Sequence, residues 1–225
     1  MRIGVSVLGL CAALGWASAA AAQEVPAART GFQLALRTGY SIPMGKTGIG
    51  VTSPLTGSTA YRMSDVTTGQ VPFVVDVGGK IIPHLFLGGY FGLAFGGEAG
   101  PTKRACDLGG GACISVSAYF GIEAQYHILP AGSVNPWLGY GAGFESLVVS
   151  QGSDSNKNLG FSGFQFARLM GGVDFRVNRI FGVGPFAELA LGRYSTLSLG
   201  SRDYDIDGGA GHQWLTLGVR FVFFP

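Results

Sequence analysis

Charged residues are scarce in this chain. Its 225 residues include 15 Lys and Arg and 13 Asp and Glu, so 12 % are charged. Soluble domains usually carry about 25 % charged residues, so this chain has too few to cover the surface of one. The formal net charge of +2 is too small to predict a nucleic-acid partner. The shortage of charge thus argues against both a soluble protein and a nucleic-acid-binding one.

A long apolar helix is also missing after the first 22 residues. The best candidate, Ile81–Gly97, is uncharged but contains Pro83 and several glycines. Inside a helix, each glycine costs roughly 1 kcal/mol relative to alanine and a proline about 3 kcal/mol. We therefore expect no transmembrane helix in the mature chain.

The N-terminus has the pattern of a targeting segment. Met1-Arg2 gives a positive start, Ile3–Trp16 is apolar, and Ala17–Ala22 is a run of small residues. This predicts a Sec signal peptide over residues 1–22, a short periplasmic segment over 23–30 and one folded domain over 31–225. A lipoprotein anchor at Cys11 is rejected, because Leu10 stands where a small residue would be needed.

Cysteine is rare, and cleavage of the signal peptide would leave only Cys106 and Cys113. In an exported protein, two cysteines this close most simply form one short disulfide. His84, His127 and His212 do not have the mutual spacing of a metal site. We expect no metal and no cofactor.

Apolar and polar residues alternate with a period of two along much of the sequence, and this repeat indicates β-strands. Long connections at Met44–Gln70, Gly96–Cys113, Ser150–Gly160 and Ser195–Gly211 alternate with short ones at 82–84, Leu129–Pro136 and Asn178–Gly182. Outer-membrane barrels have this asymmetry, with long loops at one end and short turns at the other. The eight alternating segments are Phe32–Ile42, Phe73–Ile81, Leu85–Phe95, Ile114–Ile128, Trp137–Val149, Phe164–Val177, Pro185–Tyr194 and Gly211–Pro225.

The two faces of these segments differ in charge. We assign no charged residue to the apolar face, where a Lys or Arg in mid-bilayer would cost roughly 2–4 kcal/mol. The other face carries five cations and five carboxylates, which permits complete pairing in a narrow interior. We therefore predict an all-β, eight-stranded antiparallel up-and-down transmembrane β-barrel with a plugged lumen. The predicted lumen charges are Arg37, Asp76, Lys80, Glu123, Glu145, Arg168, Asp174, Arg176, Glu188 and Arg220.

The ending of the chain resembles the C-terminal β-signal of bacterial outer-membrane proteins, with Thr216, Gly218, Phe221 and Phe223 at the matching positions. Together with the signal peptide, the opening GFQLALRTGYSIPMG and the alternating segments, it is similar to small eight-stranded barrels of the OmpA, OmpX and OmpW type. Phe224 and Pro225 follow the signal, which departs from the pattern. The resemblance implies a Gram-negative outer-membrane location, with outer-membrane lipid and the barrel-assembly machinery as partners.

Members of this group are structural, adhesive or solute-passing, so the resemblance does not choose a role. We expect a non-enzymatic barrel of structural or surface-interaction type, whose long loops would meet any extracellular ligand. The alternative is an OmpW-like passage for small apolar solutes. The His-x-Ser step of barrel deacylases is absent, since His84, His127 and His212 are each followed by other residues. The glycines at 139, 141 and 143 favour strand packing over a nucleotide loop.

Overall fold

A computed structural model describes residues 30–53, 57–100, 104, 113–151, 159–199, 202–206 and 211–224, with side chains of 48–53, 57–61 and 151 left out. The signal peptide, most of the segment 23–30, and Cys106 lie outside these residues. Within the described part, the chain forms ten strands and one short helix. They are β1 Gly31–Ser53, β2 Gly57–Arg62, α1 Met63–Val66, β3 Thr67–Ile82, β4 Leu85–Glu98, β5 Cys113–His127, β6 Val134–Gln151, β7 Leu159–Arg176, β8 Phe181–Leu199, β9 Arg202–Asp205 and β10 Gly211–Phe223.

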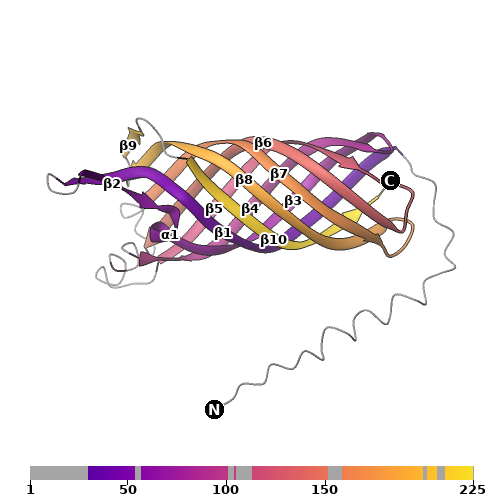
Figure 1. Ribbon diagram of the computed structural model, residues 1–225, viewed down its shortest axis with the longest axis horizontal. Helices are drawn as coiled ribbons and strands as arrows, with labels where there is room; N and C mark the ends of the chain where they lie inside the picture. The colour runs from indigo at the N-terminus through magenta and orange to yellow at the C-terminus, as the bar shows by residue number, and fades with distance from the viewer. Residues whose placement is uncertain are drawn as a thin grey trace, which may run out of the picture.

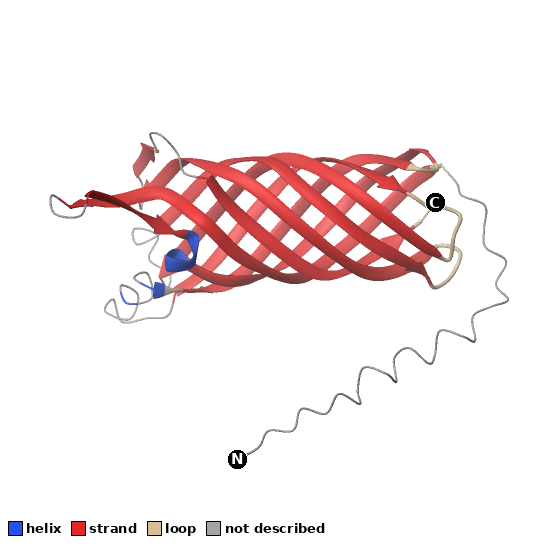
Figure 2. Ribbon diagram, in the orientation of Figure 1, coloured by secondary structure: helices blue, strands red, loops and turns tan. Residues whose placement is uncertain are grey.

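The strands close into a barrel (Figures 1 and 2), and eight of them make up its wall. The order is β10-β1-β3-β4-β5-β6-β7-β8, every neighbouring pair is antiparallel, and β8 pairs with β10 to complete the circle. The predicted eight-stranded antiparallel barrel is therefore confirmed. Its two chain-terminal strands are neighbours, with Leu34 opposite Phe223 and Ile42 opposite Leu215.

The two ends of the barrel differ. One end, here called the turn end, carries the short connections at 83–84, 128–133 and 177–180. The other, the loop end, carries β2, α1, β9 and the long connections, and the hairpin of β1 and β2 projects beyond the rest (Figure 1). No helix among the described residues is long and apolar enough to cross a bilayer.

The strands are longer than the sequence predicts, and Met44–Gln70 is not the expected loop. β1 continues to Ser53, pairs with β2, and is followed by α1 before β3 begins. Ser195–Gly211 is likewise not a loop throughout, because β8 runs to Leu199 and pairs with β9. The reason is that a hairpin satisfies backbone donors and acceptors beyond the rim just as it does in the wall.

Alternation sorts the side chains as predicted for nearly every strand. Large apolar residues on the outward face are exposed on each barrel strand, as Phe32, Phe73 and Phe91 are. One outward position breaks the pattern: Arg193 on β8 is exposed on the outer face near the loop end, where the sequence analysis expects no charge. Its place close to the rim lets a guanidinium reach the polar edge of a bilayer.

Candidate functional site: the interior of the barrel

The interior of the barrel is the only part of the described chain where charged side chains gather out of reach of solvent. Nine of the ten predicted lumen charges are buried, and Arg176 is half-buried at the end of β7. They sit at three levels: a middle network, a carboxylate near the loop end and a cationic group near the turn end. Each level has its own chemistry.

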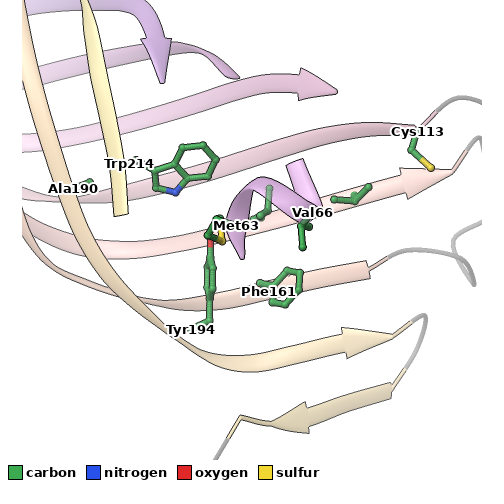
Figure 3. Close-up of a cluster of buried hydrophobic side chains, with 9 residues drawn as sticks. Met63, Val66, Cys113, Phe161, Ala190, Tyr194 and Trp214 are labelled. Carbon is green, nitrogen blue, oxygen red and sulfur yellow. The ribbon is translucent and has the colours of Figure 1, made fainter. Parts of the chain in front are cut away.

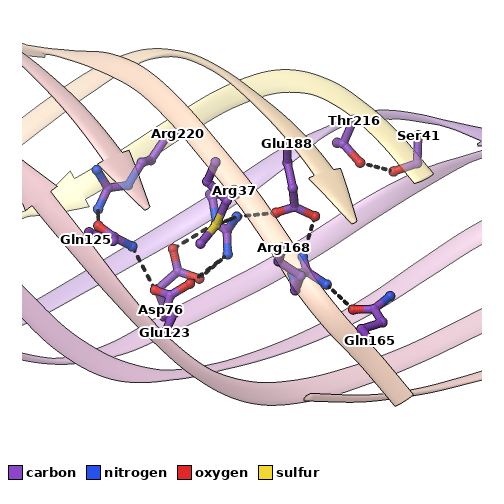
Figure 4. A network of polar contacts seen from close by, with 11 residues as sticks. Arg37, Ser41, Asp76, Glu123, Gln125, Gln165, Arg168, Glu188, Thr216 and Arg220 are labelled. Atoms are coloured by element: carbon purple, nitrogen blue, oxygen red, sulfur yellow. Dashed lines mark hydrogen bonds and ion pairs between the residues drawn. The ribbon is translucent and has the colours of Figure 1, made fainter. Parts of the chain in front are cut away.

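Arg37 is the centre of the middle network (Figure 4). Its guanidinium donates to both Asp76 oxygens, with Nε to Oδ2 at 2.8 Å and Nη2 to Oδ1 at 2.7 Å. It also donates to Glu188 at 2.5 Å and to Glu123 at 3.4 Å. Arg37 stands on β1 and Glu123 on β5, so this contact crosses the barrel from one wall to the other.

Arg168 is the second cation of the middle network. It donates to Glu188, which it shares with Arg37. Its guanidinium carbon lies 4.4 Å from the ring centre of Tyr90 and 4.6 Å from that of Tyr119. Cation–π contacts of this kind stabilise a desolvated guanidinium in addition to its ion pair. Two strands far from β7, namely β4 and β5, thus hold the Arg168 head group.

Two glutamines extend the network along the axis, and the sequence analysis missed this role for both. Gln125 donates to Glu123 at 2.7 Å and accepts from Arg220 at 2.7 Å. Gln165 accepts from Arg168 at 3.0 Å and donates to Glu145. Their positions in the alternating pattern indicate that both glutamines face the lumen. The sequence does not indicate which charged residues each amide contacts. The resulting chain of polar contacts runs from Glu145 to Arg220.

Glu145 forms the level near the loop end, and no Lys or Arg among the described residues lies within ion-pair distance of it. Its carboxylate accepts from His212 Nε2 at 2.8 Å, from Trp214 Nε1 at 2.8 Å and from Tyr194 at 3.0 Å, as well as from Gln165. The His212 ring also stacks on Tyr194 at 3.9 Å between centres. An imidazole and three neutral donors therefore surround Glu145 in place of a Lys or Arg.

An apolar cluster covers this level from the loop end. Met63 and Val66 of α1 are buried against Trp214, Tyr194 and Phe161 (Figure 3). The rest of the cluster consists of Leu147, Val149, Ala190 and Cys113. Below it, the interior contains a cavity of about 10 Å³, bordered by Glu145, Arg168 and Glu188 among others. That volume is close to the smallest that can hold one water.

The level near the turn end contains Arg220, Lys80 and Arg176. Arg220 pairs with Asp174 at 2.8 Å. Lys80 and Arg176 have no carboxylate within ion-pair distance among the described residues; they flank the Phe224 ring, at 5.4 Å and 4.3 Å from its centre. Arg176 also donates to the Pro130 carbonyl. Equal numbers of each sign permit complete pairing, but the described residues do not show it at this level.

Interior glycines make room for bulky side chains. A Cβ at Gly141 would come within 3.3 Å of the Tyr90 ring, and one at Gly139 within 3.2 Å of the Met170 terminal methyl. A Cβ at Gly143 would meet the Tyr90 hydroxyl at 2.6 Å. The predicted packing role of these glycines is confirmed.

The residues of the β-signal pattern lie where β10 closes on β1. The hydroxyls of Thr216 and Ser41 are 2.7 Å apart, and a Cβ at Gly218 would collide with the Thr38 carbonyl. Phe221 and Phe223 face outward and pack on Phe181, with ring centres at 6.5 Å and 5.3 Å. Their role in assembly stays a prediction, as does the disulfide, since Cys106 lies outside the described residues.

Among the described residues, no group of three or more His, Cys, Asp or Glu could hold a metal ion. On the outer wall, a groove of about 490 Å³ lies over β5, β6 and β7, lined by Phe120, Phe144 and Phe164. Glu145 borders both this groove and the small interior cavity. The wall is locally irregular here, because the pairing of β7 with β8 shifts register at Ser162/Gly163 and at Gln165/Ala167.

No protein-family profile matches the chain, and no curated protein sequence matches it either. Solved structures do. The outer membrane protein OprG from Pseudomonas aeruginosa aligns at 9 % identity over 88 % of this chain and 98 % of its own, with a TM-score of 0.50. Neisserial surface protein A aligns at 15 % identity over 85 % and 97 %, with a TM-score of 0.47. The outer membrane protein AlkL aligns at 15 % identity over 90 % and 95 %, with a TM-score of 0.49. The fold is that of the small eight-stranded outer-membrane barrels.

Proposed function

We propose that this chain is an integral outer-membrane protein that does not conduct solutes along its axis and acts through its loop end as a structural or surface-interaction protein. On this view the turn end faces the periplasm and the loop end faces outward. The contact of Arg37 with Asp76, Glu123 and Glu188 carries the proposal, because it joins opposite walls at mid-height. A solute path there would require breaking buried ion pairs, each of which costs several kcal/mol to disrupt.

Two further features support a closed interior. The apolar cluster of α1 covers the loop end, and Phe224 lies across the turn end with 7 % of its surface exposed. The interior cavity of about 10 Å³ has room for one water and not for a hydrated ion. No catalytic arrangement is part of the proposal, and the barrel needs no cofactor to carry it out.

Planar-bilayer recordings test this function. The wild-type protein should give no steady openings, whereas Arg168→Ala should raise leak or lower thermal stability, because it leaves Glu188 with one cation fewer. The matched control is Arg202→Ala, an exposed position on β9, which should change neither. Steady wild-type openings would contradict the closed lumen. Unchanged leak and stability in Arg168→Ala would show that the charge network does not seal the interior.

A second candidate is passage of small apolar solutes through the wall, and the outer groove favours it. Three phenylalanines line the groove, and a hydrophobic solute would leave it directly into lipid. Uptake of an apolar fluorescent dye by liposomes containing the protein separates the candidates. Dye entry that falls when Ala118, which lines the groove, is replaced by tryptophan would support lateral passage, while entry equal to that of protein-free liposomes would remove it.

A further inference from the structure

The interior charges balance over the whole barrel but not at each level. The middle level holds two cations, Arg37 and Arg168, against three carboxylates. Among the described residues, the interior at the turn end holds three cations, Lys80, Arg176 and Arg220, against the single carboxylate of Asp174. Three positive charges and one negative charge leave two in excess at the turn end. Charges withdrawn from water need compensation close by, so the surplus in the middle level does not supply it.

Lys80 and Arg176 carry this excess. Arg220 donates to Asp174 and Gln125 through its two terminal nitrogens, whereas the other two cations have the face of Phe224 in common. Lys80 is only 4 % exposed, so water does not replace a counter-ion there. The quadrupole of an aromatic ring compensates a cation less well than a full negative charge does.

Donors without partners gather at the same end. Arg176 Nε has no hydrogen-bond partner, and neither amide atom of Gln33 has one, although Gln33 is fully buried. Gln33 faces inward on β1, next to Leu34, whose Cα pairs with that of Phe223 beside the Phe224 ring. Buried polar groups in native proteins are nearly always bonded, so Arg176 Nε can take a further acceptor; Gln33 Oε1 and Asp174 Oδ1 at this end are acceptors that likewise have no partner.

We infer that the turn end binds an anion bearing a phosphate group between Lys80 and Arg176, at the position of the Phe224 ring. A guanidinium offers paired N–H donors that match phosphate oxygens, and a lysine adds a point charge. Phe224 lies just beyond the end of β10; its N–H donates to the Ile180 carbonyl at 2.9 Å, and it packs in a cluster with Ala35 and Val222. Its ring can therefore move aside without disturbing a barrel strand. The phosphate could belong to free phosphate or to a phospholipid headgroup, both of which meet this end if it faces the periplasm.

Thermal unfolding of the refolded protein in an uncharged detergent tests the site. Sodium phosphate should raise the midpoint in a saturable way relative to sodium gluconate of equal ionic strength, because a ligand of the native state stabilises it. A second arm uses dihexanoyl phosphatidylglycerol below its micelle concentration. Stabilisation by phosphate identifies the small anion as sufficient, and stabilisation by the lipid alone identifies a headgroup. Both Lys80→Met and Arg176→Met should lose the effect, while Arg202→Gln on β9 should keep it.

Phe224→Ala gives a readout that does not depend on removing a buried cation. Without the ring to displace, the apparent affinity for the effective ligand should rise about fivefold, the equivalent of one cation–π contact. The proposal is overturned if neither phosphate nor the lipid stabilises the wild type beyond gluconate. It is equally overturned if the effect persists in both methionine variants, or if Phe224→Ala binds no more tightly. The site does not rest on whether the lumen conducts.

Discussion

Glu145 shows how a single buried carboxylate can organise one level of the interior. Four donors converge on its two oxygens, from β7, β8 and β10. Removing an acceptor from such a cluster costs more than each bond contributes, because the donors stay buried without a partner. Glu145 therefore contributes to stability even though no described Lys or Arg forms an ion pair with it.

Replacing Glu145 by leucine should lower the free energy of unfolding by roughly 3 kcal/mol or more, because it leaves the Trp214, Tyr194 and His212 donors buried without an acceptor. Urea unfolding in lipid vesicles, followed by tryptophan fluorescence, measures this loss. Asp203→Leu is the matched control, because Asp203 lies exposed on β9, and it should change stability by no more than about 0.5 kcal/mol. Equal stability of the two variants would mean that the convergence on Glu145 is not energetically significant.

Arg37 poses the opposite case, a cation shared among three carboxylates. Arg37→Met should destabilise the barrel by roughly 3–5 kcal/mol, since Asp76 and Glu123 would then repel each other without compensation. The double variant Arg37→Met with Asp76→Asn should recover part of that loss. Chemical unfolding of the two single variants and the double variant gives the coupling free energy directly. Additive effects would show that the Arg37–Asp76 contact contributes little.

At the scale of elements, α1 is the helix that the sequence does not predict. Its four residues lie inside Met44–Gln70, where glycine, serine and threonine predict a loop. Met63 and Val66 become buried only because the β1–β2 hairpin returns the chain over the mouth of the barrel. Strand alternation, by contrast, was readable from local sequence, because each outward position faces the same apolar surroundings along the strand.

The same distinction applies to the candidate site. Inward parity identified all ten lumen charges, since a period of two fixes the face of each residue. Which partner each charge takes depends on the stagger between strands that are distant in sequence. That is why no individual ion pair could be predicted, and why the imidazole beside Glu145 and the ring between Lys80 and Arg176 are seen only in the structure. Arg193 was missed for another reason: it lies near the rim, where the outer face no longer has to be apolar.

α1 should act as a cover over the loop-end interior. Met63→Asp should expose Trp214 to aqueous acrylamide, because a charged side chain is not stable inside the apolar cluster. Trp137→Phe in the same background, in protein expressed from residue 23 onward and therefore without Trp16, isolates the Trp214 signal. Ser64→Asp is the control, as Ser64 is the exposed neighbour on α1, and its quenching should equal that of the parent. Identical quenching in the two aspartate variants would contradict the cover.

At the scale of the whole molecule, closure joins the strand nearest the start of the folded domain to the one nearest its end. Both edges of β10 are paired, with β1 on one side and β8 on the other. A sheet that spans a bilayer must close in this way, because an open edge would leave backbone donors and acceptors without partners in lipid. The intact barrel should therefore migrate faster than the boiled protein on a denaturing gel when the sample is left unheated.

A covalent link across the closing seam tests this architecture most directly. Ser41 and Thr216 face each other in register across β1 and β10, with their hydroxyl oxygens 2.7 Å apart inside the barrel. In a background with Cys106 and Cys113 replaced by serine, Ser41→Cys with Thr216→Cys should form a disulfide on oxidation. The link would close a loop covering most of the folded domain, so the oxidised protein should stay more compact than the reduced protein after boiling.

The matched control pairs Ser41→Cys with Thr196→Cys, since Thr196 lies on β8 opposite Ser162 and Asp205 and not beside β1. That pair should give no intramolecular link under the same oxidation, because its Cα atoms belong to strands separated by β10 at the seam. A reducing agent should return the linked Ser41/Thr216 variant to the mobility of the boiled parent. Failure of that pair to crosslink in folded, heat-modifiable protein would mean that β1 and β10 do not meet in this register, and the barrel would then have to close differently.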